Sequence, residues 1–533
     1  MNSKFKLSFP QENIFLVEKM NSNSSINMIT AILNINNIFD EKYCKYSINR
    51  LFNDNDLLRA KIMEENNIHY QFIQDFEEQD IEIKDFTVYS KNDINEYILE
   101  FSNKPISIKS RYLCEVKILK YSNNCGAILF KIHHIIADAW SIYKIGTLLR
   151  KYYNEVLYGI QENDTYSENY FDYIVTEYEY RESEKYENDK MFWHEYLQGM
   201  DNVIDLKEKS ITTSTKANRY STNIDLELNN YIDDYCKNNN ISKYSLLLGV
   251  ISIYIHNLKN ENDITIGTPL LNRSNFKEKN MLGMFVSTFP FRIKIKDNPK
   301  VVDFLKEISL NTKSMLKHQK YPYYKILEEI HSETNIKDKL YNIVLSFQNG
   351  KVNFQDQNFK VDWAFSGNIQ NTLEIHVLDP NNSGILTINY DYLIDLFEEK
   401  DIFYLNKRLM NIISLIVKDE YIKVEDIDLF DEEERSLIYS INNTTLHYQK
   451  DENFMKLFKE QVDKNPNKVA IVFKDKNISY NELDVQSNKL AYYLREKIGV
   501  SRNDIVSIIT NRGIEMLVSI VAILKSRSCI FTY

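Results

Sequence analysis

Glycine is scarce in this chain, and its distribution excludes two common classes of nucleotide site. The 533 residues include only 12 glycines, and no two of them stand at G-x-G spacing. The dinucleotide-binding fingerprint and the Walker A loop both need clustered glycines to bring backbone amides onto phosphate groups. We therefore exclude NAD-linked chemistry and P-loop ATP chemistry.

Cysteines and long apolar runs are also few. The five cysteines are scattered and form no C-x-x-C pair, which argues against a zinc site, or any metal site of that kind, and against a disulfide framework. The apolar run from Met516 to Leu524 is too short to cross a bilayer, and the first residues lack the apolar core of a secretory signal. We expect a reduced, cytoplasmic protein without membrane contact.

Positive charge is not in excess. The 65 Lys and Arg residues are outnumbered by 76 Asp and Glu residues, which gives a net charge of −11. Nucleic-acid binding needs a basic footprint, and no Lys/Arg-rich block provides one, so we exclude a nucleic-acid partner. The chain is also far longer than a single domain of about 100–200 residues, which predicts three or more folding units.

Two predicted strands lead to the most informative segment. Apolar patterns over residues 113–120 and 125–132 are separated by the turn-like sequence Tyr-Ser-Asn-Asn, which predicts a β-hairpin. In the second strand Ile128, Phe130 and Ile132 share one face, and Ala127 and Leu129 share the other. A strand that is apolar on both faces is typical of the interior of a sheet. A helical apolar stripe follows in residues 141–158.

The remaining pattern predicts a mixed α/β protein. Residues 165–200 predict helices that end near Gly199. Further helices are predicted at 242–257 and 396–417, and strands at 264–267, 284–295, 341–348 and 384–392. The polar stretch 431–450 predicts a connecting segment, and another short unit starts near residue 453.

His133 and His134 stand where the second strand of the hairpin ends, and Asp138 follows before the helix. Adjacent residues of a regular strand point to opposite faces, so the two imidazoles cannot serve one site together. Two buried structural histidines are the simpler interpretation, but strand ends are also where sites are built. Asp138 either orients an imidazole or needs a buried cationic partner, and the sequence alone leaves both roles open.

Acyl transfer from a thioester suits one positioned histidine without a metal or a nucleotide loop. The donor is already activated, so no covalent enzyme intermediate is required. An acceptor amine with a pKa of about 8 can lose its proton to an imidazole with a pKa of about 6.5 as the new bond forms. Holding both substrates end to end would supply further acceleration through proximity.

The sequence His-His-Ile-Ile-Ala-Asp-Ala at 133–139 resembles the HHxxxDG signature of condensation domains of nonribosomal peptide synthetases, members of the chloramphenicol-acetyltransferase-like superfamily. Six further segments resemble motifs of that family and occur in the family's order. They are Ser8 to Gln11 with Ile14, Asp56 to Arg59, Tyr170 to Tyr173 with Phe192 to Leu197, Ile266 to Pro269 with Arg273 and Gly283 to Arg292, His318 to Tyr323, and Leu340 to Asn349.

The resemblance implies an α/β fold of two chloramphenicol-acetyltransferase-like lobes in a V-shaped pseudo-dimer. The first lobe is expected at 1–175 and the second at 176–430. His134 would be the catalytic residue in a tunnel between the lobes. His133, Asp138 and Arg273 would support the site, with Arg273 as the partner of Asp138.

The resemblance also implies the substrates. The domain would form an amide between a thioester-bound acyl or peptidyl donor and an aminoacyl acceptor, each held on a partner carrier domain. Phosphopantetheine would come from those carriers, or the donor would be an acyl-CoA, so no cofactor would bind in this chain. The tunnel-lining candidates are Ala139, Trp140, Ser141, Ser287 and Gln348.

Two of these candidates depart from the family pattern. Ala139 stands where the family has Gly, and Ser287 replaces an Asn. Alanine is tolerable there if the backbone φ is negative and destabilises the local backbone if φ is positive. Neither departure removes His134.

After an expected linker at 431–452, residues 453–533 resemble the start of an adenylation domain. Ile478 to Leu483 matches its first core motif, and Leu524-Lys525 begins the second. We expect this truncated region neither to bind ATP nor to activate an amino acid.

Several alternatives share this sequence pattern. Pro10, Gln11 and Ile14, with the stretch Ser24 to Asn27, look like starter-type domains of lipopeptide synthesis that accept fatty acyl-CoA. An epimerization-type domain has the same fold and histidines, but the adenylation-like tail disfavours it. A non-catalytic remnant that serves as a recruitment platform is the alternative of a different class.

Overall fold

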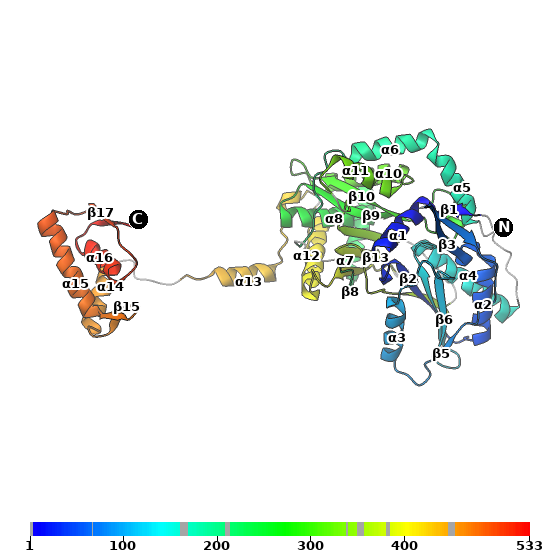
Figure 1. Ribbon diagram of the computed structural model, residues 1–533, viewed down its shortest axis with the longest axis horizontal. Coiled ribbons are helices and arrows are strands. Elements are labelled where there is room, and N and C mark those ends of the chain that lie inside the picture. Colours follow the sequence, from blue (N-terminus) through cyan, green and yellow to red (C-terminus); the bar gives the residue numbers. More distant parts are fainter. Residues whose placement is uncertain are drawn as a thin grey trace. The chain divides into compact units, whose positions relative to one another are not determined.

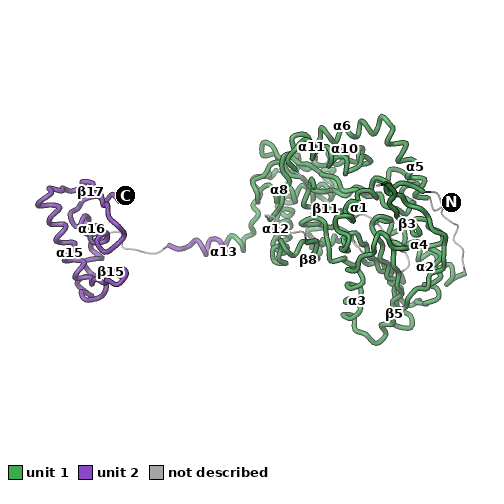
Figure 2. Tube along the Cα trace, viewed as in Figure 1, with its two compact units in different colours: residues 1–435 green, residues 436–533 purple. Residues whose placement is uncertain are grey.

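The computed structural model describes residues 4–66, 68–159, 169–207, 214–336, 339–348, 357–379, 384–419, 421–445 and 453–532. The chain divides into two compact units, residues 1–435 and residues 436–533 (Figure 2). Each unit has its own buried apolar core.

The first lobe of the larger unit is built on a five-stranded sheet with the order β12-β2-β7-β6-β5 (Figure 1). Its strands are β2 (Met28–Ile35), β5 (Ile83–Asp85), β6 (Cys114–Lys120), β7 (Gly126–His133) and β12 (Phe359–Ala364). The predicted hairpin is confirmed by the antiparallel pairing of β6 with β7. Every residue of β7 is buried, as expected for an internal strand.

Helices cover both faces of this sheet. α2 (Glu41–Asp54) and α4 (Ala139–Tyr158) pack on the face that carries Ile128, Phe130 and Ile132. α3 (Lys91–Asn103) packs on the face that carries Ala127 and Leu129. Each apolar face of β7 therefore packs against one of the two helical layers.

A small antiparallel sheet of order β1-β4-β3 lies beside this lobe and had no counterpart in the predicted elements. It consists of β1 (Phe5–Lys6), β3 (Ala60–Glu65) and β4 (Ile68–Ile73). α1 (Phe9–Met20) follows β1 and begins with a capping box, in which the Ser8 side chain accepts from the Gln11 amide and the Gln11 side chain accepts from the Ser8 amide. This box fixes the start of α1.

The second lobe is built on a six-stranded mixed sheet with the order β10-β9-β11-β13-β14-β8. The strands are β8 (Ala217–Asn223), β9 (Asp263–Leu270), β10 (Ser287–Lys294), β11 (Ile343–Gln348), β13 (Leu373–Leu378) and β14 (Thr387–Leu393). The helices of this lobe are α6 (Glu184–Leu197), α7 (Leu226–Asn239), α8 (Lys243–Lys259), α9 (Phe276–Asn280), α10 (Val301–Lys317), α11 (Tyr323–Glu333) and α12 (Glu399–Lys418). The helix that precedes them, α5 (Tyr170–Arg181), packs in the core of the first lobe. α8 is apolar nearly all round because it packs between the sheet and both α10 and α12.

One strand crosses between the lobes. β12 comes from the second half of the sequence but pairs antiparallel with β2 of the first lobe, with Val361 opposite Leu33. Two side-chain contacts also join distant segments, Ser24 Oγ with Thr215 Oγ1 at 3.0 Å and Ser25 Oγ with the Ser366 carbonyl at 2.7 Å. The lobe boundary expected after residue 175 stays a prediction.

The segment expected to be a polar connection contains a helix, α13 (Glu432–Asn442), none of whose residues is buried. The smaller unit then has α14 (Phe454–Lys464), α15 (Tyr480–Tyr493) and α16 (Ile514–Lys525). Two two-stranded sheets complete it, β15 (Val469–Phe473) with β16 (Lys476–Ser479), and β17 (Ile505–Ile508) with β18 (Cys529–Thr532).

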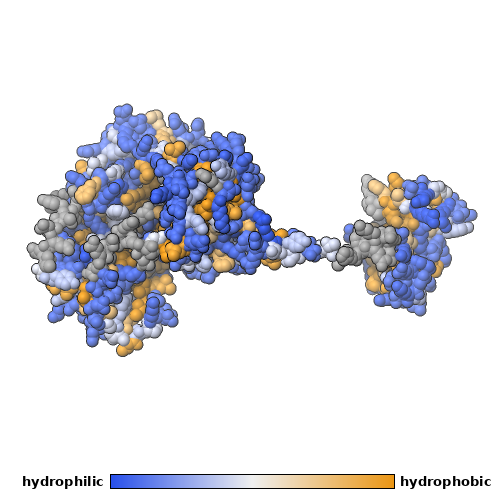
Figure 3. Space-filling view, turned by 180° about the vertical axis from the view of Figure 1, so that it is seen from behind, coloured by the Kyte–Doolittle hydropathy of each residue, from blue (hydrophilic) through white to orange (hydrophobic). Residues whose placement is uncertain are grey.

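Within the described ranges no helix is long and apolar enough to cross a membrane. The face of the molecule in Figure 3 carries mostly hydrophilic side chains, with apolar patches scattered among them.

Candidate active site

The site begins where β7 ends. The backbone N–H of His133 donates to the Leu113 carbonyl at 2.8 Å, and that of His134 donates to the Asn27 carbonyl at 2.7 Å. The chain then turns through residues 134–136 and enters α4, whose N-cap is Asp138. Neighbouring segments on both sides therefore hold the two histidines at the strand end.

His133 has no exposed surface. Its Nδ1 accepts from the Ile135 amide at 3.1 Å, so its proton lies on Nε2 in the neutral form. That Nε2 lies 3.3 Å from Oε2 of Glu18, a buried carboxylate that also accepts from Asn27 Nδ2 at 2.8 Å. Both ring nitrogens of His133 thus face protein groups.

His134 differs because the residue as a whole is only partly buried. Its Nδ1 lies 3.1 Å from Sδ of Met284, which comes from the loop before β10. Burial of most of the ring lowers the pKa of His134 below its usual value and outweighs the charge of Asp138, which acts in the opposite direction. A lowered pKa keeps the imidazole neutral, and so able to accept a proton, near pH 7.

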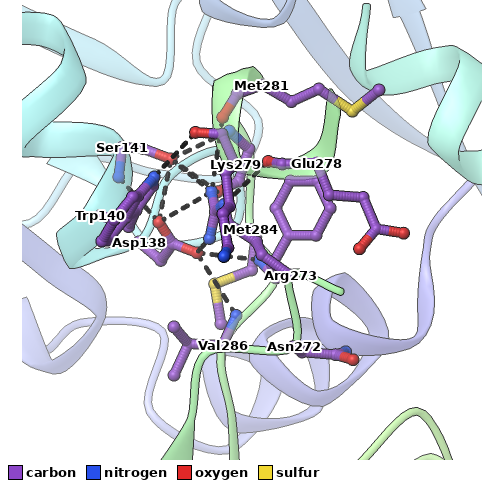
Figure 4. Close-up of polar contacts among 12 residues, drawn as sticks. Asp138, Trp140, Ser141, Asn272, Arg273, Glu278, Lys279, Met281, Met284 and Val286 are labelled. Carbon is purple, nitrogen blue, oxygen red and sulfur yellow. Dashed lines mark hydrogen bonds and ion pairs between the residues drawn. The ribbon is translucent and has the colours of Figure 1, made fainter. Parts of the chain in front are cut away.

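Asp138 forms a buried ion pair with Arg273, as Figure 4 shows. Arg273 Nη1 lies 2.5 Å from Asp138 Oδ2, and Nη2 lies 3.2 Å from Oδ1. The carboxylate also accepts from the Ser141 amide and hydroxyl, both at 2.9 Å, and from the amides of Phe285 and Val286 at 3.1 and 3.3 Å. Asp138 therefore joins the start of α4 to the loop before β10.

The groups around Asp138 stabilise its charged form. Burial alone would raise the pKa of Asp138, but the Arg273 charge and the hydrogen bonds hold it below its usual range. Arg273 has its own further contacts, since Nε donates to the Glu278 carbonyl at 3.1 Å and its guanidinium lies 4.1 Å from the centre of the Phe285 ring. The Asp138–Arg273 pairing that the sequence resemblance implied is present.

The tunnel candidates are placed differently from one another. Ser141 has no exposed surface, and its hydroxyl lies inside the ion-pair network, with Oγ 2.8 Å from the Gly283 carbonyl oxygen. Trp140 is partly exposed, and its Nε1 donates to the Lys279 carbonyl at 2.9 Å. Ser287 starts β10 and is mostly buried, and Gln348 is a partly exposed residue at the end of β11. Asn349, the last residue of its motif, lies outside the described residues.

Ala139 is accommodated without strain. It is the first residue of α4 and is not among the described residues with positive φ. The local backbone therefore has no need for glycine at this position.

The structure adds residues that had no stated role. Gln11 Nε2 donates to the Ile135 carbonyl at 3.0 Å, next to His134. The Tyr170 hydroxyl donates to the Met284 carbonyl at 2.5 Å and contacts Ser8 Oγ at 2.7 Å. These residues lie in motifs that the sequence singled out, whereas Glu18 carried no sequence signal. No group of three His, Cys, Asp or Glu side chains able to hold a metal ion occurs among the residues that the structure describes.

Two family models match the sequence. The model described as Condensation domain matches residues 1–439, and the model described as AMP-binding enzyme matches residues 458–532. Surfactin synthase subunit 1 of Bacillus subtilis (strain 168) is 28% identical over 530 residues, which are 98% of this chain and 15% of that protein. Gramicidin S synthase 2 of Brevibacillus brevis is 25% identical over 537 residues, 98% of this chain and 12% of that protein. The chain thus spans only a small part of the length of these two synthetases.

Solved structures share the fold. A four-domain nonribosomal peptide synthetase in its holo form, bound to AMP and glycine, has a TM-score of 0.83 at 18% identity. The aligned region covers 99% of this chain and 41% of the synthetase chain. A variant of the starter condensation domain of rhizomide synthetase, in complex with C8-CoA, has a TM-score of 0.73 at 15% identity and covers 80% of this chain and 98% of that chain. The expected two-lobed α/β fold with a partial AMP-binding region is thereby confirmed. Because the condensation-domain match extends over residues 1–439, well over half of the chain, the chain belongs to the condensation domain family of nonribosomal peptide synthetases.

Proposed function

We propose that residues 1–439 form an amide bond between an acyl thioester donor and the amino group of a carrier-bound aminoacyl acceptor, with His134 as the general base. The observation that carries this proposal is the position of His134 at the strand end, where it is partly buried while His133 beside it has no exposed surface. Its lowered pKa supports the role because a base must be unprotonated at the working pH.

The reaction follows from this arrangement. The acceptor nitrogen attacks the thioester carbonyl carbon while Nε2 of His134 takes a proton from that nitrogen. The tetrahedral intermediate then collapses, the C–S bond breaks, and the proton returns to the departing thiolate. One new C–N bond and one free thiol result, so no oxidant or metal is consumed.

The substrates of this reaction are part of the proposal. Phosphopantetheine on donor and acceptor carrier domains would present the two thioesters, and the partners of this chain would be those carriers. A fatty acyl-CoA donor of the starter type is supported by the C8-CoA in the rhizomide synthetase starter domain, which shares the fold.

Substitution of His134 tests the proposal. We expect His134→Ala to lower kcat by about 10²–10⁴-fold, because this is the range that general base catalysis contributes. The assay follows amide formation from C8-CoA or a carrier-bound acyl donor and an aminoacyl thioester, by mass spectrometry. The matched control is His194→Ala on α6, whose side chain is 46% exposed.

Full activity of a folded His134→Ala protein would contradict the catalytic role. Absence of any amide product from the wild-type chain with every donor tested would instead favour the non-catalytic recruitment platform. Exchange of the acceptor's α-proton without amide formation would favour the epimerization-type alternative.

A further inference from the structure

A short 3-10 helix, η1 (Ser25–Asn27), stands directly before β2 and contacts the main chain of the site. The Asn27 carbonyl accepts from the His134 amide at 2.7 Å, and the next residue, Met28, pairs with His133 across β2 and β7. A displacement of η1 would therefore move the hydrogen-bond partner of the His134 amide.

Two segments from later in the sequence meet at the other end of η1. Residues 215–217 lead into β8, and residues 365–369 connect β12 of the first lobe with β13 of the second. Two main-chain hydrogen bonds of 2.9 Å join them, from the Ala217 amide to the Gly367 carbonyl and from the Ile369 amide to the Thr215 carbonyl. Because these bonds use no side chain, the two segments form a junction that does not depend on the side-chain contacts made to it.

Ser25 ties η1 to this junction. Its hydroxyl donates to the Ser366 carbonyl at 2.7 Å and accepts from Asn368 Nδ2 at 2.7 Å. Asn368 Oδ1 in turn accepts from the Thr215 hydroxyl at 2.7 Å. That hydroxyl has a single hydrogen, so Ser24 is the donor in its 3.0 Å contact with Thr215. Both ends of the Asn368 amide are thus engaged, one with η1 and the other with the segment before β8.

The tie between η1 and the junction is shielded from water. Ser25 is 1% exposed and Asn27 is 3% exposed. A buried group that loses its partner cannot replace it with solvent, so the loss is relieved by movement of the groups that remain. Misplacement of a reacting group by about 1 Å can lower a rate by about 10²-fold, even when the change is made far from the chemistry.

We propose that Ser25 and Asn368 are positioning residues, whose hydrogen bond seats η1 on the junction and thereby fixes the main chain at His134 for the reaction. The catalytic consequence rests on the proposed function. The hydrogen bond between the His134 amide and the Asn27 carbonyl is present without substrate, so its dependence on Ser25 is tested separately.

The first experiment measures hydrogen exchange of the His134 amide in the full chain. Labelling with nitrogen-15 at histidine restricts the backbone signals to nine residues, and His134→Ala assigns the one that is needed. We expect Ser25→Ala to raise this exchange rate about two- to tenfold, the change that corresponds to one hydrogen bond. The amide of His256, inside α8, is the internal reference and should keep its exchange rate.

The second experiment measures catalysis. We expect Ser25→Ala and Asn368→Ala each to lower kcat about three- to thirtyfold with little change in KM, because a displaced catalytic group slows the reaction step more than binding. The double variant should be about as slow as the slower single variant, since both changes break the same bond. Ser47→Ala is the matched control, because it removes a buried hydroxyl that donates to the Tyr43 carbonyl within α2, and it should alter neither measurement.

An unchanged exchange rate of the His134 amide in folded Ser25→Ala would overturn the proposal. Wild-type kcat in the folded single variants, or an equal loss of kcat in Ser47→Ala, would overturn it as well. Asn368 is only partly buried, so Asn368→Ala supplies both measurements if Ser25→Ala does not fold. Absence of activity in the wild-type assay would count against the proposed function alone, since hydrogen exchange needs no turnover.

Discussion

The carboxylate of Asp138 is fully occupied by donors from two distant segments of the chain. Arg273 and the amides of Phe285 and Val286 come from more than 130 residues away in sequence, and Ser141 comes from the helix that Asp138 caps. At the residue scale this answers the question that the sequence left open. Asp138 is half of a buried ion pair with Arg273.

Neutralising one partner of this pair should be more damaging than neutralising both. We expect Asp138→Asn to lower the free energy of unfolding by about 3–5 kcal/mol, because the buried Arg273 charge is then uncompensated. The double variant Asp138→Asn with Arg273→Met should lose less free energy of unfolding than the sum of the losses of the two single variants. Urea denaturation measures all three.

An exposed ion pair supplies the control. Lys104 and Glu100 lie 2.6 Å apart with side chains 65% and 68% exposed, so removing that pair should change the free energy of unfolding by less than about 1 kcal/mol. Additive effects of the Asp138 and Arg273 changes would show that the buried pair is not coupled as the distances indicate.

At the scale of elements, three adjacent strands of the second lobe carry a charged cluster on one face. His376 of β13 lies 3.3 Å from Asp391 of β14 and 3.6 Å from Glu374. Arg219 of β8 makes a bidentate contact with Asp391 at 2.6 and 2.7 Å. Burial alone would lower the pKa of His376, but the two carboxylates outweigh burial and raise it to about 9.

This cluster predicts a pH dependence of stability. A histidine whose pKa is raised in the folded state contributes its full stabilisation of the fold at pH values below its unfolded pKa of about 6.5. That contribution is lost as the pH rises through the folded pKa of about 9. Between about pH 6.5 and pH 9, we expect the free energy of unfolding of the wild type to fall by on the order of 2 kcal/mol relative to that of His376→Gln. Urea denaturation of both proteins across the interval measures the difference.

The matched control for the substitution itself is His194→Gln, at an exposed position of α6. Parallel stability curves for wild type and His376→Gln would show that His376 is not held protonated.

At the scale of the whole chain, every residue assigned to the site lies in the unit formed by residues 1–435. The smaller unit has its own core of Phe458, Val462, Leu483, Ile514, Val518 and Val521. Compact units with separate cores usually fold separately.

A fragment of residues 1–439 should therefore retain the transfer activity of the full chain within about twofold. Denaturation of the full chain should show two transitions, one of which is absent from the fragment. The amide-forming assay and circular dichroism test these outcomes. A fragment that is folded but inactive would mean that residues beyond 439 contribute to the reaction.

The local sequence determined much of what was predicted. Alternation over 113–120 and 125–132 predicted the β6–β7 hairpin, because side chains of a strand point to alternate faces. Helical spacing predicted α4, α8 and α12, because one face or all faces of each helix pack in a core. The order of motifs also identified the family, since residues with fixed chemical roles keep their sequence order.

Tertiary structure decided the rest. The pairing of β12 with β2, the choice of Glu18 as neighbour of His133, and the contact of Met284 with His134 each join residues far apart in sequence. Local patterns carry no information on such pairs, because strand partners and buried polar contacts depend on which segments the fold brings together. The sequence placed a histidine at a strand end; only the packing of the lobes decided which groups surround its ring.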